Sequence, residues 1–136
     1  MTEAQGALTR EDMLRHASEW IDAWNRRDLD AVLAGYSKHA SFRSPVAALV
    51  TGSPLVEGRA ALEGYWRAGL SRLQSLRFDL LQAICDPDGQ TMVVHYLASL
   101  DGPPKRACEI FRFEAGVKIY GEALYGDDVA GALRRD

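Results

Sequence analysis

The sequence has no long apolar run, no cluster of basic residues, and few cysteines and histidines. No run approaches the roughly 18 apolar residues that a membrane-spanning helix needs, so we expect no membrane partner. Lys and Arg are scattered along the chain and the net charge is −3, whereas a nucleic-acid-binding domain usually gathers its basic residues on one face. We therefore expect no nucleic-acid partner.

The cysteines and histidines also lack the spacing of a metal site. Cys85 and Cys108 are expected to be reduced thiols rather than a disulfide, because the first residues, MTEAQGALTRED, contain acids and no apolar stretch of a secretory signal. No segment matches a nucleotide-binding loop or a nucleophile elbow. These features predict a cytoplasmic protein without a metal or a cofactor.

What the chain does contain is enough apolar sequence for one core. It has 136 residues, of which 47% are hydrophobic, and no repeat or linker divides it. We expect a single domain over residues 1–136, with a core over about 9–126 and a frayed helix or tail over 127–136.

The first half of the chain has the periodicity of helices. Thr9 and Asp12 resemble a capping box, and apolar residues then recur at spacings of three and four up to Trp24. A shorter helix is expected after Asp28, a strand over 39–44, a long connection over 46–58, and a third helix over about 59–73. The apolar start of that connection, VAALV, is either a lid or a packed segment.

The second half has the pattern of strands. The segments LRFDLLQAIC and TMVVHYLASL are separated by DPDG, which is a strong signal for a hairpin. Two further strands, ACEIFRF and VKIYGEALYG, follow after turns. The whole therefore predicts an α+β domain in which the helices pack on one side of a four-stranded antiparallel meander.

Three segments together carry a resemblance to a known family: WNRRDLDAVLAGYSKHASFRSP, VEGRAALEGYW and FRFEAGVKIYGEALYG. They resemble the NTF2-like superfamily, and within it the SnoaL-like and ketosteroid-isomerase-like proteins, from about Met13 to Gly126. The resemblance implies a cone-shaped half-barrel, in which a curved, mostly antiparallel sheet wraps around three N-terminal helices and leaves a pocket at its open end. It also implies a homodimer.

Glu109 lies in the middle of an apolar row on the strand ACEIFRF, with Ala107, Phe111 and Phe113. A buried carboxylate is costly, so this side chain is exposed, paired with Arg77, Arg43 or Arg112, or present for chemistry. In the ketosteroid isomerases that this chain resembles, an aspartic acid at the matching place stays protonated and stabilises an oxyanion. The resemblance therefore implies an acid or base role for Glu109.

Two other parts of the isomerase mechanism do not match. The isomerase base is an aspartate directly before a proline, where this chain has Ser44, and a tyrosine donor is replaced by Trp20. A serine does not remove a proton from carbon without a strong base beside it. The sequence therefore does not predict a standard ketosteroid isomerase.

His95 is a second catalytic candidate, because a histidine beside Glu109 would give an acid and a base of complementary pKa. A lone histidine in such a strand is more often a hydrogen-bonded structural residue, and the face of His95 is open because both faces of its strand are largely apolar. The pattern of the final strand likewise does not decide whether the face that carries Tyr120 and Glu122 points inward or outward. Residues predicted to line a ligand pocket are Trp20, Phe42, Ser44, Tyr65, Trp66 and Phe111, although a core role is favoured for Trp24 and Trp66.

Aromatic walls with one or two polar groups suit a small, apolar, ring-containing molecule. The sequence thus predicts a protein that handles such a molecule, as a cofactor-independent isomerase, dehydratase or cyclase that uses Glu109. The alternatives are a ligand-binding module without catalysis and a dimeric protein-association domain.

Overall fold

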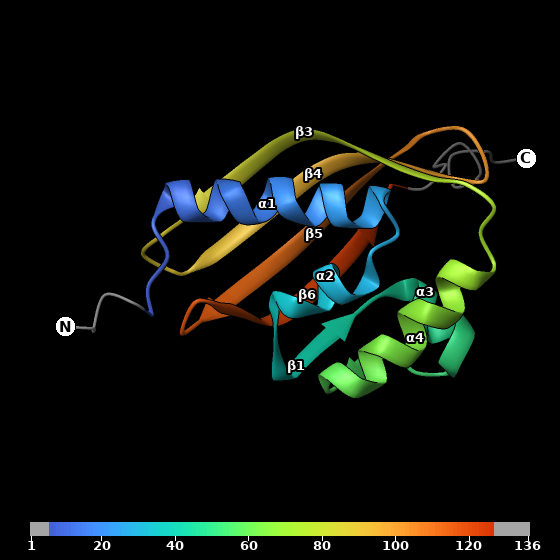
Figure 1. Cartoon of the computed structure of the whole chain (residues 1–136), viewed down its shortest axis with the longest axis horizontal. Helices are drawn as coiled ribbons and strands as arrows, with labels where there is room; N and C mark the ends of the chain where they lie inside the picture. Colours follow the sequence, from blue (N-terminus) through green and yellow to red (C-terminus); the bar gives the residue numbers. More distant parts are fainter. Residues whose placement is uncertain (1–5, 127–136) are drawn as a thin grey trace, which may run out of the picture.

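The computed structural model describes residues 6–126, and the predicted tail over 127–136 lies outside this range. One mixed sheet of six strands is covered on one face by helices (Figure 1). The helices are α1 (Arg10–Asn25), α2 (Leu29–Ala34), α3 (Pro45–Thr51) and α4 (Arg59–Ser71), and the strands are β1 (Tyr36–Arg43), β2 (Leu55–Glu57), β3 (Leu76–Asp86), β4 (Thr91–Leu100), β5 (Lys105–Glu114) and β6 (Val117–Tyr125).

The strand order in the sheet is β2-β1-β6-β5-β4-β3. Strands β3 to β6 form the predicted antiparallel meander. The sequence did not indicate that β1 would pair in parallel with β6, nor that β2 would lie at the edge beside β1. The α+β prediction is confirmed, with a larger sheet than the meander alone.

Helix α1 lies across β3, β4 and β5 (Figure 1). The predicted capping box is present, because Thr9 and Asp12 each accept a hydrogen bond from the other's backbone N–H. At the other end, the side chain of Asn25 accepts from the N–H of Phe78 at 2.7 Å and donates to its carbonyl at 2.9 Å. These bonds attach the end of α1 to β3 and place Trp20 and Trp24 over the sheet.

The predicted connection over 46–58 was wrong, since it contains a helix and a strand. Ser44 caps α3 by accepting a hydrogen bond from the N–H of Val46 at 3.1 Å, and Pro45 occupies the first helical position, where its missing N–H costs nothing. The chain therefore has four helices in its described part rather than three. The apolar segment VAALV belongs to α3, which is short and has only Ala47 fully buried.

A tight contact inside the sheet explains a glycine on β6. A Cβ built on Gly121 would lie 3.3 Å from Phe42 and 3.6 Å from Phe111. The two aromatic rings pack against the backbone at this point, so the inner face of β6 cannot carry a side chain there without displacing them.

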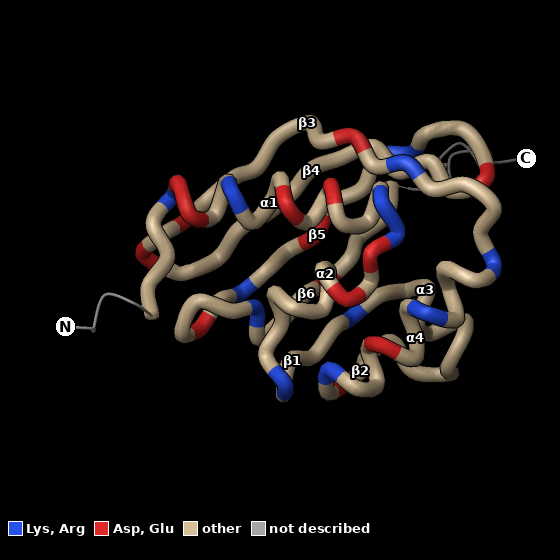
Figure 2. Tube along the Cα trace, viewed as in Figure 1, with Lys and Arg blue, Asp and Glu red and all other residues tan. Residues whose placement is uncertain are grey.

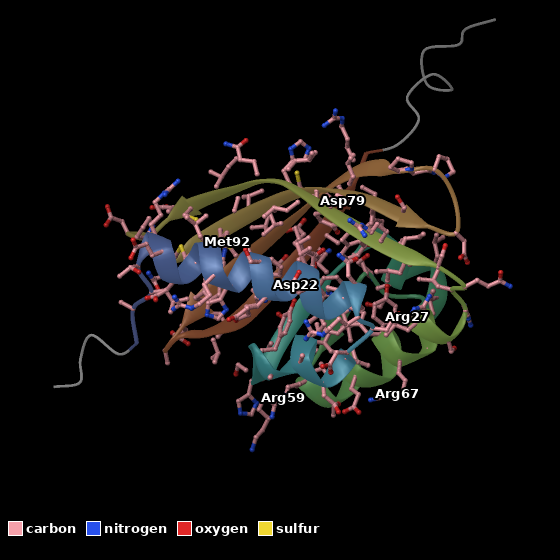
Figure 3. All side chains as sticks on the ribbon, turned by 45° about the horizontal axis from the view of Figure 1, so that its top comes forward. Asp22, Arg27, Arg59, Arg67, Asp79 and Met92 are labelled. Carbon is pink, nitrogen blue, oxygen red and sulfur yellow. The ribbon has the colours of Figure 1, made fainter. Side chains whose placement is uncertain are left out.

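Charged residues of both signs are interspersed along the described trace (Figure 2). Most of the labelled charged side chains, such as Arg67 on α4 and Asp79 on β3, extend outward, whereas Met92 lies in the core (Figure 3). Within residues 6–126 no helix is long and apolar enough to cross a membrane. The cytoplasmic location expected from the sequence stays a prediction.

Candidate functional site

Glu109 lies on the inner face of β5, in the row predicted from the alternation. The other members of the row are Ala107, Phe111 and Phe113, and all four side chains are buried. Glu109 is 4% exposed and sits in the register opposite Val94 on one side and Ala123 on the other. Its cross-strand neighbours are therefore apolar.

The arginine partners considered from the sequence do not neutralise Glu109. Arg77 pairs with Asp79 at 3.0 Å, and Arg112 extends over the ring of Tyr120 on the outer face of the sheet. No ion pair to Glu109 occurs within the described part of the chain. The hydroxyl of Tyr96 donates a hydrogen bond to Oε1 of Glu109 at 3.1 Å.

Burial raises the pKa of Glu109 from 4.5 to about 7. The hydrogen bond from Tyr96 and the charge of Lys118 act in the opposite direction and limit the rise. A carboxyl group with this pKa is present in both its acid and its base form near neutral pH, which is the condition for efficient proton transfer in either direction.

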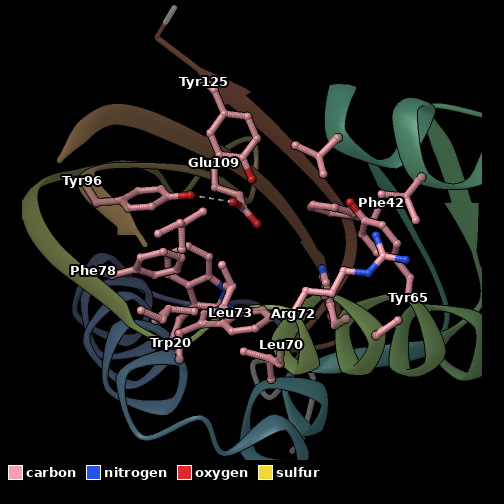
Figure 4. A pocket seen from close by; sticks show the side chains of 18 residues that line it. Trp20, Phe42, Tyr65, Leu70, Arg72, Leu73, Phe78, Tyr96, Glu109 and Tyr125 are labelled. Carbon is pink, nitrogen blue, oxygen red and sulfur yellow. Dashed lines mark hydrogen bonds between the residues drawn. The ribbon is translucent and has the colours of Figure 1, made fainter. Parts of the chain in front are cut away.

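Glu109 lines a cavity of about 300 Å³ between the helices and the sheet. Figure 4 shows its carboxyl group and the hydroxyls of Tyr96 and Tyr125 coming from the sheet side. The lining is mostly apolar, with contributions from α1, α3, α4 and five strands; the residues are Trp20, Trp24, Phe42, Val46, Val50, Tyr65, Trp66, Ala68, Gly69, Leu70, Arg72, Leu73, Leu76, Phe78, Tyr96, Leu100, Glu109 and Tyr125.

Four of the six predicted pocket residues line this cavity: Trp20, Phe42, Tyr65 and Trp66. Trp24, for which a core role was favoured, lines it as well. The rings of Trp20, Phe78 and Tyr96 pack together with centroid distances of 4.8 to 5.6 Å, so one wall of the cavity is continuous aromatic surface.

The other two predicted pocket residues lie behind the lining. Phe111 is fully buried, and its ring contacts that of Trp20 with 5.4 Å between centroids. Ser44 is 1% exposed, and its hydroxyl is engaged as the cap of α3. Phe111 therefore supports the wall, and Ser44 fixes the helix that carries Val46 and Val50.

His95 lies on the outer face of the sheet, away from Glu109. It sits opposite Cys108 in the register, while its neighbours Val94 and Tyr96 are the residues that point inward. The pairing of His95 with Glu109 considered from the sequence therefore does not form. Tyr120 and Glu122 also lie outside, where the Tyr120 hydroxyl donates to Glu122 at 2.9 Å.

Sequence reasoning missed Lys118, which is 2% exposed and lies on the inner face of β6. Its Nζ lies 4.4 Å from the ring centroid of Phe111 and 4.9 Å from that of Tyr36. Burial lowers the pKa of Lys118 to about 8, and the negative charges of Glu109 and Glu19 raise it and so limit this decrease. Strict alternation from Gly121 would have placed Lys118 outside, but the register shift after Arg112 turns it inward.

Tyr96 and Tyr125 were also missed as site residues. Burial raises the pKa of both phenols well above 10, so both stay protonated and can donate hydrogen bonds at neutral pH. Tyr96 lies in the inward row of its strand with Met92 and Val94, but the alternate row contains Val93 and Leu97 and is also largely apolar, so the pattern did not decide which row faces inward.

The geometry can be compared with known proteins. The model of the SnoaL-like domain matches residues 17–121. The chain belongs to the SnoaL-like family. A search of curated protein sequences finds no match.

Solved structures of SnoaL-like and NTF2-like proteins share this fold. A SnoaL-like protein of Burkholderia thailandensis is 27% identical, with a TM-score of 0.80 over 89% of this chain and 99% of the other. An NTF2-like protein of Burkholderia pseudomallei is 21% identical, with a TM-score of 0.74 over 90% and 95%. TerC, crystallised with polyporic acid, is 16% identical, with a TM-score of 0.73 over 90% and 96%. The predicted NTF2-like cone is thereby confirmed.

In this SnoaL-like domain the cavity combines one carboxyl group of raised pKa, an aromatic wall and the phenols of Tyr65, Tyr96 and Tyr125, whose pKa values burial also raises. Within residues 6–126 no group of three or more His, Cys, Asp or Glu side chains is placed to hold a metal ion. The arrangement can bind a ring, polarise a carbonyl oxygen and exchange a proton with carbon.

Proposed function

We propose that the protein binds a small apolar molecule with a ring in this cavity and catalyses proton transfer at the carbon next to a carbonyl. The observation that carries this proposal is the buried carboxyl group of Glu109, whose pKa of about 7 lies at the working pH of most enzymes. The net reaction is an isomerisation, a dehydration or a cyclisation, and it needs no cofactor.

Glu109 is the base and the acid in turn. Its ionised form takes a proton from carbon, the electron pair of the broken C–H bond forms a C=C bond, and the π pair of the carbonyl group moves to its oxygen. The neutral phenol of Tyr125 donates a hydrogen bond to that oxygen as negative charge develops, while the hydroxyl of Tyr96 stays bonded to Glu109. Glu109, now protonated, returns the proton to carbon at another position or to a leaving hydroxyl group.

The size of the cavity and the ligand of a fold relative support this proposal. The cavity volume of about 300 Å³ is at the lower end of the range for small-molecule sites. The fold relative TerC was crystallised with polyporic acid, which supports a small organic molecule as the occupant of the present cavity.

A non-catalytic ligand-binding role is the second candidate. It is favoured by the hydroxyl of Ser44, which is engaged as a helix cap at the position where the resemblance to the ketosteroid isomerases would place their base. In that case the cavity binds the same class of molecule, and Glu109 contributes only a hydrogen bond.

Exchange of hydrogen for deuterium separates the two candidates. A panel of cyclic ketones and enones is incubated with the protein in D₂O, and loss of the proton signal at the carbon next to the carbonyl is followed by NMR. Proton transfer predicts exchange faster than in buffer for at least one compound. Binding to the cavity without any exchange, measured by quenching of tryptophan fluorescence, supports the binding module instead.

We also propose that the protein is a homodimer that uses the outer face of the sheet. Two rows of side chains cross this face: Gln82, His95, Cys108 and Leu124, and Ile84, Val93, Ile110 and Glu122. Ile84 is 54% exposed and Leu124 is 47% exposed, while no helix in the described chain covers them. An apolar sheet face of this kind is stabilised by burial against a second copy.

An arginine on this face is expected to separate the two copies. Light scattering coupled to gel filtration should give twice the chain mass of 15.0 kDa for the wild type and a single chain mass for Leu124→Arg. Leu49→Arg is the matched control, because Leu49 is 86% exposed on α3 and belongs to neither of the two rows, so this variant should stay dimeric. A wild type of single chain mass overturns the dimer.

A further inference from the structure

The cavity has a cationic side chain on the side opposite its carboxyl group. Arg72 lines the cavity from the C-terminal end of α4, whereas Glu109 comes from the sheet (Figure 4). Arg72 is the one Lys or Arg among the lining residues of the described chain. Its side chain is exposed, and its guanidinium group makes no hydrogen bond or ion pair to any residue from 6 to 126.

The backbone that carries Arg72 is held from both sides. Arg27 donates hydrogen bonds from its guanidinium group to the carbonyls of Leu70 at 3.3 Å and Leu73 at 3.1 Å. The carboxylate of Asp101 accepts from the N–H groups of Gln74 and Ser75, the shorter bond being 2.7 Å. The charged groups of Arg27 and Asp101 thereby hold the backbone on both sides of Arg72, and neither of them is paired with Arg72.

A positive charge at one end of an apolar cavity favours ligands that carry a negative charge at that end. The groups at the far end, Glu109 and the phenols of Tyr96 and Tyr125, are suited to a neutral carbonyl or hydroxyl, because an anion there would meet the partly ionised Glu109. An anionic oxygen group of the ligand is therefore disfavoured at the sheet end and favoured at Arg72, where a planar guanidinium can bind it with two hydrogen bonds.

We propose that the ligand is an amphipathic acid: an apolar ring that carries a carboxylate or another anionic oxygen group, bound by Arg72, with its carbonyl end directed to Glu109. This inference rests on the proposed function and adds the class of molecule and its orientation. Arg72 is then the residue that determines specificity, while Glu109 does the chemistry.

A matched pair of probes tests the charge preference. 2-Naphthoic acid and 2-naphthamide have the same ring and nearly the same shape, but only the acid is negatively charged at pH 6. All three tryptophans of the chain line the cavity, so quenching of their fluorescence reports occupancy of this site. The dissociation constants of both probes are measured at pH 6, below the pKa of about 7 of Glu109, so that its charge does not oppose the acid.

The wild type is expected to bind the acid about 10-fold more tightly than the amide, because a charge-assisted bidentate contact is stronger than a neutral one. Arg72→Gln should remove this preference and leave the affinity for the amide unchanged. Arg67→Gln is the matched control, since Arg67 lies on the same helix, points away from the cavity and pairs with Glu63 at 2.8 Å (Figure 3). This control should keep the full preference.

Equal binding of acid and amide by the wild type overturns the role of Arg72 and leaves the proposed function standing. A preference that survives in Arg72→Gln also overturns it, because another group then recognises the charge. Absence of any quenching by either probe overturns this inference together with the ring-binding cavity on which it rests.

Discussion

Glu109→Gln is expected to lose at least about 100-fold, and up to about 10⁴-fold, of the deuterium exchange that the wild type catalyses. Glutamine has the shape of glutamate and keeps an oxygen that can accept the hydrogen bond from Tyr96, which is 3.1 Å long in the wild type. It cannot take a proton from carbon near neutral pH. The loss is therefore expected in the turnover rate rather than in the fold or in ligand affinity.

The matched control is His95→Gln, which changes the other predicted catalytic residue. Because His95 lies on the outer face of the sheet, this variant is expected to keep the exchange activity of the wild type. Tryptophan quenching by the substrate confirms that both variants still bind. Full activity in Glu109→Gln would mean that another group moves the proton.

The same substitution is expected to change how stability depends on pH. The pKa of Glu109 is 4.5 when the group is unperturbed and about 7 in the folded protein, so the folded state binds more protons than the unfolded state between these values. The free energy of unfolding therefore falls as the pH rises from about 4.5 to about 7. For Glu109 alone the full change is roughly 3 kcal/mol, since each pKa unit corresponds to 1.36 kcal/mol.

Urea denaturation at a series of pH values measures this effect. The quantity to compare is the difference in unfolding free energy between Glu109→Gln and the wild type, because contributions of other groups, such as His16, largely cancel in it. The difference should shift in favour of the variant by up to roughly 3 kcal/mol between pH 4.5 and pH 7.5. A difference that is flat over this range would contradict a raised pKa.

Local signals in the sequence predicted much of the fold, because the physics behind them is local. The capping box at Thr9 and Asp12 satisfies N–H groups within one helical turn. The hairpin around Asp88 and Gly89 depends on turn residues flanked by apolar runs. The inward row that contains Glu109 follows from a period of two, which the strand maintains between Ala107 and Phe111.

Features that depend on contacts distant in sequence could not be predicted. The parallel pairing of β1 with β6 joins residues separated by some eighty positions, such as Phe42 and Gly121. Lys118 points inward because the pairing of β5 with β6 shifts by one residue after Arg112, and no residue pattern in the sequence indicates this shift. Arg72 faces the cavity because the end of α4 is held by Arg27 and Asp101, two residues far from it in sequence.

The sequence predicted the lining of the candidate site in part. The carboxyl group and four of its aromatic neighbours were predicted from alternation and from the resemblance to SnoaL-like proteins. The sequence suggested His95 as the partner of the carboxyl group, whereas the hydrogen-bond partner in the structure is its neighbour Tyr96. A shift of one residue moves a side chain to the opposite face of a sheet, so the two candidates differ completely in what they touch.

The pKa of Glu109 tests the account most directly. It is measured by NMR titration of the side-chain carboxyl carbons, with the Glu109 signal assigned by its absence in Glu109→Gln. A value of about 7 is expected, as burial in an apolar cavity requires. A value at or below 4.5 would mean that water or a counter-charge stabilises the ionised carboxylate, and it would contradict Glu109 as the group that exchanges a proton with the ligand.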